Sequence, residues 1–411
     1  MAAQSSSSRF NVEEKEILVF TGVAHGLTHY VELTYPTLAV FIAAESSLPL
    51  EQVLGWSLIG YALFGLGALP AGIMADRIGS KPLVVLGIGA AGLSSLAAAM
   101  VPVGWPLGLC LAGIGLGAST YHPAGMGLIS RAVRARGAAL GINGIYGNVG
   151  IALAPMTTSL LANAFGWRAT FALTGGLLVV AAIGGQLLPF RDPPRAEVPA
   201  ESVAGRAAIP TRRVVIFIVL CLASMLAGFS YRANTVAQPA LFSERIAILD
   251  FGMAATIAML FGVAGQYLGG RIADRFSLVW GYFAFHLLSL PMLLLMTVTF
   301  DLPLLVASSL FVFFALGMQP IENSLYAQLT PERWRSTAYG LKFTLTFGIG
   351  SSAVVMVRAV AGSSGFVGVY HFLVGVVVLI VLLALAVASL SRRLPREPAI
   401  ALDGVPLQEV E

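Results

Sequence analysis

GIMADRIGSK, residues 72–81, is a short charged stretch between two long apolar runs. Gly72 and Gly79 give the backbone the freedom that a tight turn needs. The stretch also carries three charges that the hydrocarbon core of a membrane does not tolerate, Asp76, Arg77 and Lys81. A partial copy, GRIADR at 270–275, begins 198 residues after Gly72, close to half the length of the chain. The sequence therefore predicts two related halves, each with a polar turn between membrane spans at an equivalent place.

The composition is that of a polytopic membrane protein. Of the 411 residues, 57% are hydrophobic and 11% are charged, with a mean hydropathy of +0.85, whereas soluble proteins carry about 25% charged residues. The net charge of +4 does not indicate nucleic-acid binding, because the basic residues lie in short loops between apolar runs. Cys110 and Cys221 lie within apolar runs of different halves, so neither a disulfide nor a metal site is expected from them.

Apolar stretches of about 20 residues, long enough to cross a membrane as helices, recur along the whole chain. Those in the first half are 17–44, 53–75, 82–101, 105–129, 138–162 and 170–190. Those in the second half are 213–242, 251–274, 278–298, 303–329, 336–361 and 366–390. We therefore expect an all-α membrane protein with twelve transmembrane helices in two six-helix bundles, at 17–190 and 213–390. The polar segment 191–212 is the expected linker, and 1–16 and 391–411 are the expected tails.

The distribution of basic residues predicts the orientation in the membrane. Nineteen of the 24 Lys and Arg residues fall in predicted loops and tails on one side. Only Arg168 and Arg245 fall on the opposite side, and Arg232, Lys342 and Arg358 lie within spans. Because cytoplasmic loops are rich in Lys and Arg, both termini and the linker are expected in the cytoplasm, with the chain in the bacterial inner membrane. The first residues show no pattern of a cleaved signal peptide.

Small residues predict where helices approach closely, since lipid gives no hydrophobic drive for helix association. Four glycines recur every third residue in the fifth predicted span: Gly141, Gly144, Gly147 and Gly150. A similar set occupies the eighth predicted span: Gly262, Gly265 and Gly269. We expect both sets to pack against neighbouring helices.

Taken together, the charged turn, its half-chain copy and the twelve spans resemble the major facilitator superfamily of secondary transporters. The loop signature of that family is G-x-L-x-D-R-x-G-R-K, and the positions that match it are Gly72, Asp76, Arg77, Gly79 and Lys81. Met74 stands for the usual Leu and Ser80 for the usual Arg, while the second copy retains Gly270, Asp274 and Arg275. The resemblance assigns conformational gating to Gly72, Asp76, Arg77, Gly79, Lys81, Asp274 and Arg275, with Asp76 locking the two halves on the cytoplasmic side.

Three further stretches resemble the branch of that family that includes fosmidomycin-resistance-type efflux proteins. They are GVAHGLTHYVELTYPTL at 22–38, ASTYHPAG at 118–125 and GWRATF at 166–171. That branch often has histidines in the first span and a His-Pro pair in the fourth. The fifth span keeps the glycines of the antiporter motif but lacks its Gly-Pro pair.

Ionisable side chains within the first and fourth spans are the expected proton-coupling groups. Such residues are costly in a bilayer and normally face the bundle interior or a wet cavity. His25, His29 and Glu32 share one helix face at i, i+4 and i+7, and His122 lies at a similar depth to His25, roughly 12–14 Å from the cytoplasmic side. The resemblance places the first and fourth spans side by side, so we expect His25 and His122 to approach each other. Histidine exchanges protons near neutral pH.

Polar residues in the fourth, seventh and tenth spans are the expected substrate-binding groups. They are Tyr121, Tyr231, Arg232, Asn234, Gln238, Gln319, Glu322 and Asn323. Arg232 suggests either an anionic substrate group or a carboxylate partner. Glu322 is not the expected partner, because the two residues differ in depth by roughly 13 Å. Lys342 lies nearer the level of Glu322, and a structural Glu322–Lys342 pair competes with a role of Glu322 in binding substrate.

These features predict a secondary transporter that exports a small organic solute in exchange for protons by alternating access. An anionic metabolite, favoured by Arg232, or a metal ion, favoured by His25, His29, Glu32 and His122, is an alternative cargo, and a non-transporting membrane sensor is a further alternative. An enzyme is not expected, since no nucleophile accompanies the histidines at motif spacing. No cofactor, no resident metal and no nucleotide site is expected. The expected partners are the solute, protons and the lipid bilayer, and the chain is expected to be a monomer.

Overall fold

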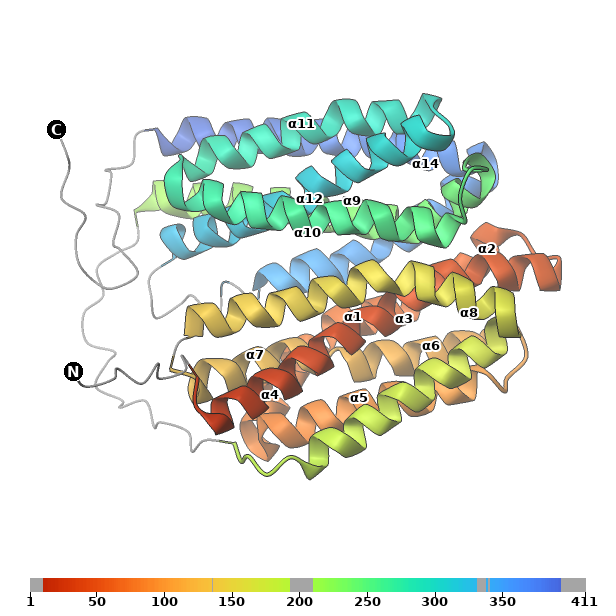
Figure 1. The fold of residues 1–411 in the computed structure, drawn as a ribbon. Helices are drawn as coiled ribbons and strands as arrows, with labels where there is room; N and C mark the ends of the chain where they lie inside the picture. Colours follow the sequence, from red (N-terminus) through yellow and green to blue (C-terminus); the bar gives the residue numbers. More distant parts are fainter. Residues whose placement is uncertain (1–9, 135, 193–209, 331–337, 339–340, 393–411) are drawn as a thin grey trace, which may run out of the picture.

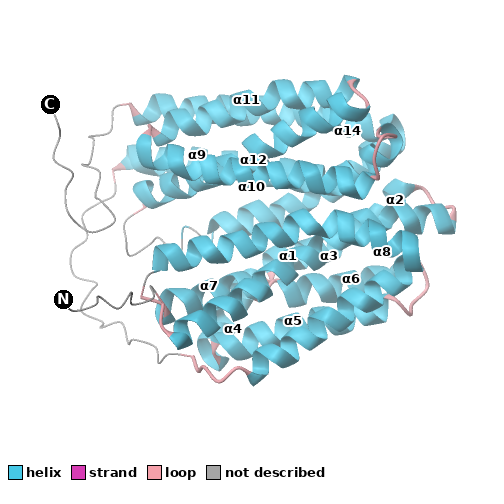
Figure 2. Ribbon diagram, in the orientation of Figure 1, coloured by secondary structure: helices cyan, strands magenta, loops and turns pink. Residues whose placement is uncertain are grey.

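A computed structural model describes residues 10–134, 136–192, 210–330, 338 and 341–392. Within these residues every regular element is helical (Figure 2). The predicted linker 191–212 and the tails 1–16 and 391–411 fall wholly or partly outside the described residues, so their boundaries stay predictions.

The first half, residues 10–192, folds into helices that correspond to the first six predicted spans. They are α1 (Val12–Ser46), α2 (Leu50–Gly55), α3 (Leu58–Leu66), α4 (Ala68–Ile78), α5 (Ser80–Ala98), α6 (Trp105–Ala118), α7 (Tyr121–Ala132) and α8 (Arg136–Leu187). Gly166 has a positive φ of 80° and breaks α8, so that this element contains the predicted spans 138–162 and 170–190.

The second half, residues 210–392, repeats this plan. It contains α9 (Thr211–Arg245), α10 (Phe251–Arg275), α11 (Leu278–Val298), α12 (Asp301–Leu329), a π-helical turn η3 (Thr344–Gly348), a 3₁₀ turn η4 (Ile349–Ser352) and α14 (Ala353–Ser391). Gly365, with φ 68°, breaks α14 as Gly166 breaks α8. The two breaks mark equivalent hairpins between the last two spans of each half.

By length and composition, seven helices of the described residues can cross a membrane, or eight if the bent pair Leu50–Leu66 and Ala68–Ala75 counts as one span. Two of the seven, Ala139–Leu187 and Leu341–Ser391, contain the breaks at Gly166 and Gly365. The predicted spans 53–75 and 105–129 are each built from shorter helices. Gly67 marks the break between α3 and α4, and Ser119 follows the last residue of α6, just before α7. The two breaks lie against each other, because a Cβ added to Gly67 would lie 2.5 Å from Ser119 Oγ.

The two halves lie one above the other in Figure 1, and the beginning of α1 and the end of α14 lie at the same end of the molecule. At the opposite, distal end the halves are in contact. Ser159 Oγ on α8 lies 2.8 Å from Asp250 Oδ2, and the rings of Phe41 and Phe251 are 5.6 Å apart. In keeping with this, α1 is buried on all sides from Val31 to Ala39. The halves are therefore closed upon each other at the distal end.

Glycines set the closest helix crossings. A Cβ on Gly150 would lie 2.0 Å from the carbonyl oxygen of Gly26, and one on Gly147 would strike the His25 ring. The prediction of close packing is thus right for these two, but it is wrong for Gly141 and Gly144, where an added Cβ would meet nothing within 4 Å. All three glycines predicted in the eighth span, Gly262, Gly265 and Gly269, pack against α12.

Candidate functional site

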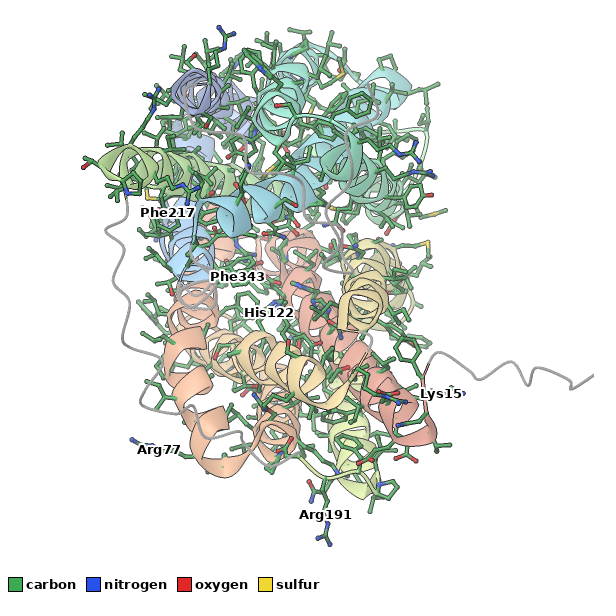
Figure 3. All side chains as sticks on the ribbon, turned by 90° about the vertical axis from the view of Figure 1, so that its left-hand side faces the viewer. Lys15, Arg77, His122, Arg191, Phe217 and Phe343 are labelled. Atoms are coloured by element: carbon green, nitrogen blue, oxygen red, sulfur yellow. The ribbon has the colours of Figure 1, made fainter. Side chains whose placement is uncertain are left out.

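A cavity of about 260 Å³ lies between the two halves. Its walls come from α1, α7 and α8 of the first half and from α9 to α12, the η3 region and α14 of the second. Figure 3 looks along the molecule from the end opposite to the distal contacts, and His122 and Phe343 lie centrally there, where the two bundles meet. Arg77 and Arg191 point outwards at the periphery.

Three histidines form one wall of the cavity. His25 and His29 come from successive turns of α1, and His122 comes from the start of α7. The ring centroids of His25 and His122 are 5.2 Å apart, and those of His29 and His122 are also 5.2 Å apart. The predicted approach of His25 to His122 is therefore present. His25 is fixed by a 2.9 Å hydrogen bond from Nδ1 to the carbonyl oxygen of Asn143 and by stacking on Tyr121.

Behind this wall, His29 is linked to an ion pair that joins the two halves. Its Nδ1 lies 2.9 Å from Glu32 Oε2, and Glu32 Oε1 accepts a hydrogen bond from Arg232 on α9. The Arg232 guanidinium also lies 3.8 Å from the centre of the Tyr61 ring. Both charged side chains are almost completely buried. A chain of contacts thus runs from the cavity to a charged contact between the halves.

A second buried ion pair lies on the other wall. Lys342 Nζ is 2.7 Å from Glu322 Oε2, which is the pair predicted from their depths. Glu322 Oε1 accepts hydrogen bonds from Ser224 at 2.7 Å and from Tyr282 at 3.1 Å. Lys342 also donates to Asn323 Oδ1 at 2.5 Å. Paired with each other and with three further hydrogen-bond partners, the two charges are compensated within the protein.

Amide side chains cross from one half to the other along the cavity. Asn148 on α8 donates to Gln266 on α10, and Gln266 Nε2 donates to Gln319 Oε1 on α12 at 2.9 Å. These three residues line the cavity together with Phe343 and Phe347. The site therefore offers uncharged polar groups and aromatic faces beside its two compensated ion pairs.

The structure brings most of the predicted site residues to this cavity. Those that line it are His25, His29, His122, Tyr231, Gln319, Glu322 and Asn323. Five others are buried behind its walls: Glu32, Tyr121, Arg232, Asn234 and Gln238. Gln238 donates to Ser308 Oγ at 2.6 Å, and Asn234 accepts from Tyr370 at 3.2 Å. In this conformation these buried residues hold helices together, and their assignment to substrate binding stays a prediction.

Sequence reasoning missed several of the site residues, including Asn148 and Gln266. His286 on α11 lines the cavity, and as a histidine within a predicted span it carried the same signal as His25. Asn143 holds both His25 and Tyr121, and Phe343 and Phe347 stack on His122. An asparagine within an apolar span could have been predicted as a site residue, because a buried amide needs polar partners. Two phenylalanines in an apolar run could not, because they do not differ from ordinary lipid-facing or core residues.

The loop predicted to gate the transporter is a tight link between α4 and α5. Gly79 has a φ of 94°, which favours glycine. The backbone N–H of Lys81 donates to Asp192 at 3.1 Å, and Lys81 Nζ donates to the carbonyl oxygen of Leu188 at 2.6 Å, so that the loop is tied to the end of α8. Arg275, at the end of α10, is exposed. The side chains of Asp76 and Asp274 lie outside the described part of the structure, and the gating role of the motif stays a prediction.

Two relatives align with this chain over most of its length at about a quarter sequence identity. A Bacillus subtilis (strain 168) protein named "Uncharacterized MFS-type transporter YfnC" is 24% identical over 361 residues, covering 85% of this chain and 87% of its own. A Helicobacter pylori (strain ATCC 700392 / 26695) protein named "Probable sugar efflux transporter" is 25% identical over 339 residues, covering 77% and 83%.

Solved structures share the fold. A bacterial homolog of the human lysosomal transporter Spinster, in an inward-facing and unoccupied conformation, superposes with a TM-score of 0.76 at 16% identity, covering 93% of this chain and 98% of its own. The family model described as Major Facilitator Superfamily matches residues 18–355. With its two helical halves, central cavity and this match, the chain belongs to the Major Facilitator Superfamily and is a secondary transporter rather than an enzyme.

Proposed function

We propose that this chain exports a small, uncharged polar solute across the bacterial inner membrane in exchange for protons. The observation that carries the proposal is the contact chain from the cavity through His29 and Glu32 to Arg232 on the other half. A proton on Glu32 would neutralise the carboxylate and remove its attraction for Arg232. Proton binding at a cavity-linked group is thereby coupled to a contact that holds the two halves together.

The groups that surround Glu32 suit such a coupling. His29 and the other two histidines lie between the carboxylate and the cavity, and His29 is within hydrogen-bonding distance of it. From α3, Tyr61 donates to the backbone carbonyl of Glu32 at 3.2 Å, and from α9, Arg232 supplies the opposing charge. A histidine–carboxylate set of this kind can pass a proton near neutral pH.

The direction and the class of solute are supported by the relatives and by the cavity wall. The Helicobacter pylori relative is named a sugar efflux transporter. In this chain Asn148, Gln266 and Gln319 present amides, and Phe343 and Phe347 present aromatic faces, which are groups that recognise hydroxyl-rich, uncharged molecules. We place the end with the chain termini in the cytoplasm. Closure at the distal end then corresponds to an inward-facing carrier, the state named for the Spinster homolog.

An anionic solute, such as the phosphonate fosmidomycin, is the second candidate. Lys342 lines the cavity and favours an anion, and the resemblance of residues 22–38 and 118–125 to the fosmidomycin-resistance branch points the same way. Against this, both buried cations already have carboxylate partners, Glu322 for Lys342 and Glu32 for Arg232. We therefore favour the uncharged solute.

Flux into proteoliposomes tests the proposal. The full chain is reconstituted with a pH-sensitive dye inside, and uptake of radiolabelled monosaccharides and of fosmidomycin is measured with and without an imposed pH gradient. We expect gradient-driven movement of a monosaccharide with opposite proton flux, lost in Glu32→Gln. The matched control is Glu45→Gln on the same helix, because the Glu45 side chain is more than half exposed and pairs with Arg168.

Unchanged gradient-driven flux in Glu32→Gln would remove Glu32 from the coupling. Binding of solute without any flux would make the chain a sensor, and movement of fosmidomycin but of no monosaccharide would replace the uncharged solute by the anion.

A further inference from the structure

We infer that His25, His29 and His122 form a binding site for one transition-metal dication of the class of Zn²⁺, Ni²⁺ or Co²⁺. Each histidine offers one ring nitrogen, and these three nitrogens lie within 4.8 Å of one another. Imidazole is the ligand that such metals favour. The sequence alone predicted no resident metal. The site does not depend on which solute the chain moves.

Hydrogen bonds already fix the tautomers of two of the three rings. His25 Nδ1 lies 2.9 Å from the carbonyl oxygen of Asn143, and His29 Nδ1 lies 2.9 Å from Glu32 Oε2. Carbonyl and carboxylate oxygens can only accept hydrogen bonds, so Nδ1 of each neutral ring must carry the proton that it donates. Nε2 of both rings then carries a lone pair. Histidines that bind metals almost always donate their other N–H to such an acceptor, which orients the ring and raises its basicity.

The third ring provides an independent indication of a ligand. Both nitrogens of His122 are buried, and neither has a hydrogen-bond partner in the described structure. Buried polar atoms are nearly always satisfied. The ring is held at the cavity wall by stacking on Phe343 and Phe347, with centroids 5.9 and 6.0 Å away, and by the edge of Phe64. A metal ion would satisfy one of these two nitrogens.

Distances and charges around the trio permit the ion. Nitrogen ligands lie about 2.0–2.1 Å from Zn²⁺ in a tetrahedral site, which places them about 3.4 Å apart. The ring nitrogens, now within 4.8 Å of one another, therefore need to approach by up to about 1.4 Å. The adjoining cavity leaves the fourth coordination position open to water or cargo. The positive charge of Arg232 is offset by its ion pair with Glu32. Tyr61, which lies against Arg232, and Tyr121, which stacks on His25, are neutral as phenols.

Calorimetric titration tests the site. The purified full chain, without a polyhistidine tag, is titrated in detergent with ZnCl₂ and NiCl₂. We expect one ion per chain. His122→Ala, His25→Ala and His29→Ala should each weaken binding at least tenfold, and Glu32→Gln should weaken it by about 10–100-fold through the orientation of His29.

The chain supplies two matched controls in its other histidines. His286 lines the opposite wall of the cavity and His371 is exposed on α14, so His286→Ala and His371→Ala should bind as the parent does. Thermal unfolding without metal checks that each variant is folded, and His122→Asn keeps a polar side chain of similar bulk should His122→Ala fail to fold. With CoCl₂ the parent should show the intense visible absorption of tetrahedral Co²⁺, and replacement of any one of the three histidines should abolish it.

Absence of stoichiometric binding, or unchanged affinity in folded His122→Ala or His122→Asn, would overturn the inference. Equal losses in His286→Ala would place the metal elsewhere in the cavity and overturn it as well. Because binding is measured without transport, failure of the metal site and failure of the proposed proton exchange are separate results.

Discussion

At the scale of single residues, the two buried ion pairs show what depth along a helix can and cannot predict. Depth excluded Glu322 as the partner of Arg232 and favoured Lys342 for Glu322, and the second pair is present. The partner of Arg232 is Glu32, on the other half of the chain. Depth could not identify it, because a single sequence does not show which helices of different halves become neighbours. The cost of burying Arg232 predicted only that some carboxylate or anion is near.

Removing one member of the second pair should destabilise the protein. Lys342→Met leaves Glu322 buried without its counter-charge, and we expect a loss of about 3–5 kcal/mol. The double variant Glu322→Gln/Lys342→Met should recover most of that loss, since no charge then remains. Thermal unfolding in detergent measures both. A double variant no more stable than the single one would show that hydrogen bonds of Glu322, and not charge balance, dominate.

A third pair, outside the membrane spans, predicts a dependence of stability on pH. Three contacts from Arg134 and Asn11 lower the pKa of Glu14 from 4.5 to about 2, the side-chain hydrogen bond to Arg134 being the strongest cause. A carboxylate whose pKa is lowered on folding stabilises the fold above its unfolded pKa, and this contribution is lost as the pH falls from about 4.5 towards 2.

Glu14→Gln should therefore lower the melting temperature at pH 7, and the difference from the parent should shrink as the pH falls below 4.5. Melting curves at intervals between pH 7 and pH 3 measure it. A difference that stays constant down to pH 3 would instead assign the effect to the Asn11 capping interaction.

At the scale of helices, the glycines show why a repeat can mislead. Residues of an α-helix are 100° apart, so each step of three residues falls 60° short of a full turn. Gly141 and Gly150 consequently point to opposite sides of α8, and only the end of the series that faces α1 packs. In α10, the spacing of Gly262, Gly265 and Gly269 keeps all three on one face, and all three meet α12. The helices themselves were predictable from hydropathy, whereas their breaks at Gly67 and Ser119 depend on how two helices meet.

Alanine substitutions on α8 test this difference within one helix. Alanine favours a helix over glycine by about 1 kcal/mol, so Gly141→Ala should stabilise slightly. Gly150→Ala places its Cβ 2.0 Å from the Gly26 carbonyl oxygen and should destabilise by about 1–3 kcal/mol. Melting temperatures of the two purified variants provide the measurement. A Gly150→Ala variant as stable as Gly141→Ala would mean that α1 and α8 can separate without cost.

At the scale of the whole molecule, the half-chain copy of the charged turn correctly predicts two helical halves, and the structure places a cavity between them. The sequence could not predict which end is closed, because an alternating-access carrier uses the same residues in both states. The contacts that decide it, such as Ser159 with Asp250 and Phe41 with Phe251, are ordinary polar and aromatic side chains near span ends. Nothing in their spacing sets them apart.

Locking the distal end should stop transport. In a background with Cys110 and Cys221 replaced by serine, Ser159→Cys and Asp250→Cys bring two thiols to positions whose side-chain oxygens are now 2.8 Å apart. Oxidation should abolish flux in proteoliposomes and a reductant should restore it, whereas each single-cysteine variant should be insensitive to oxidation. Full flux in the oxidised, cross-linked protein would show that these helices need not separate during the cycle.

The two buried ion pairs, Lys342 with Glu322 and Arg232 with Glu32, affect the charge that the protein carries across the membrane. With both pairs intact the interior carries no net charge from these four groups, and each bound proton adds one positive charge to the moving centre. Exchange of an uncharged solute for one proton would therefore be electrogenic, and an inside-negative voltage would assist it by about 2.3 kcal/mol per 100 mV for each proton that enters. A potassium diffusion potential set with valinomycin should accelerate export even when the pH is equal on both sides.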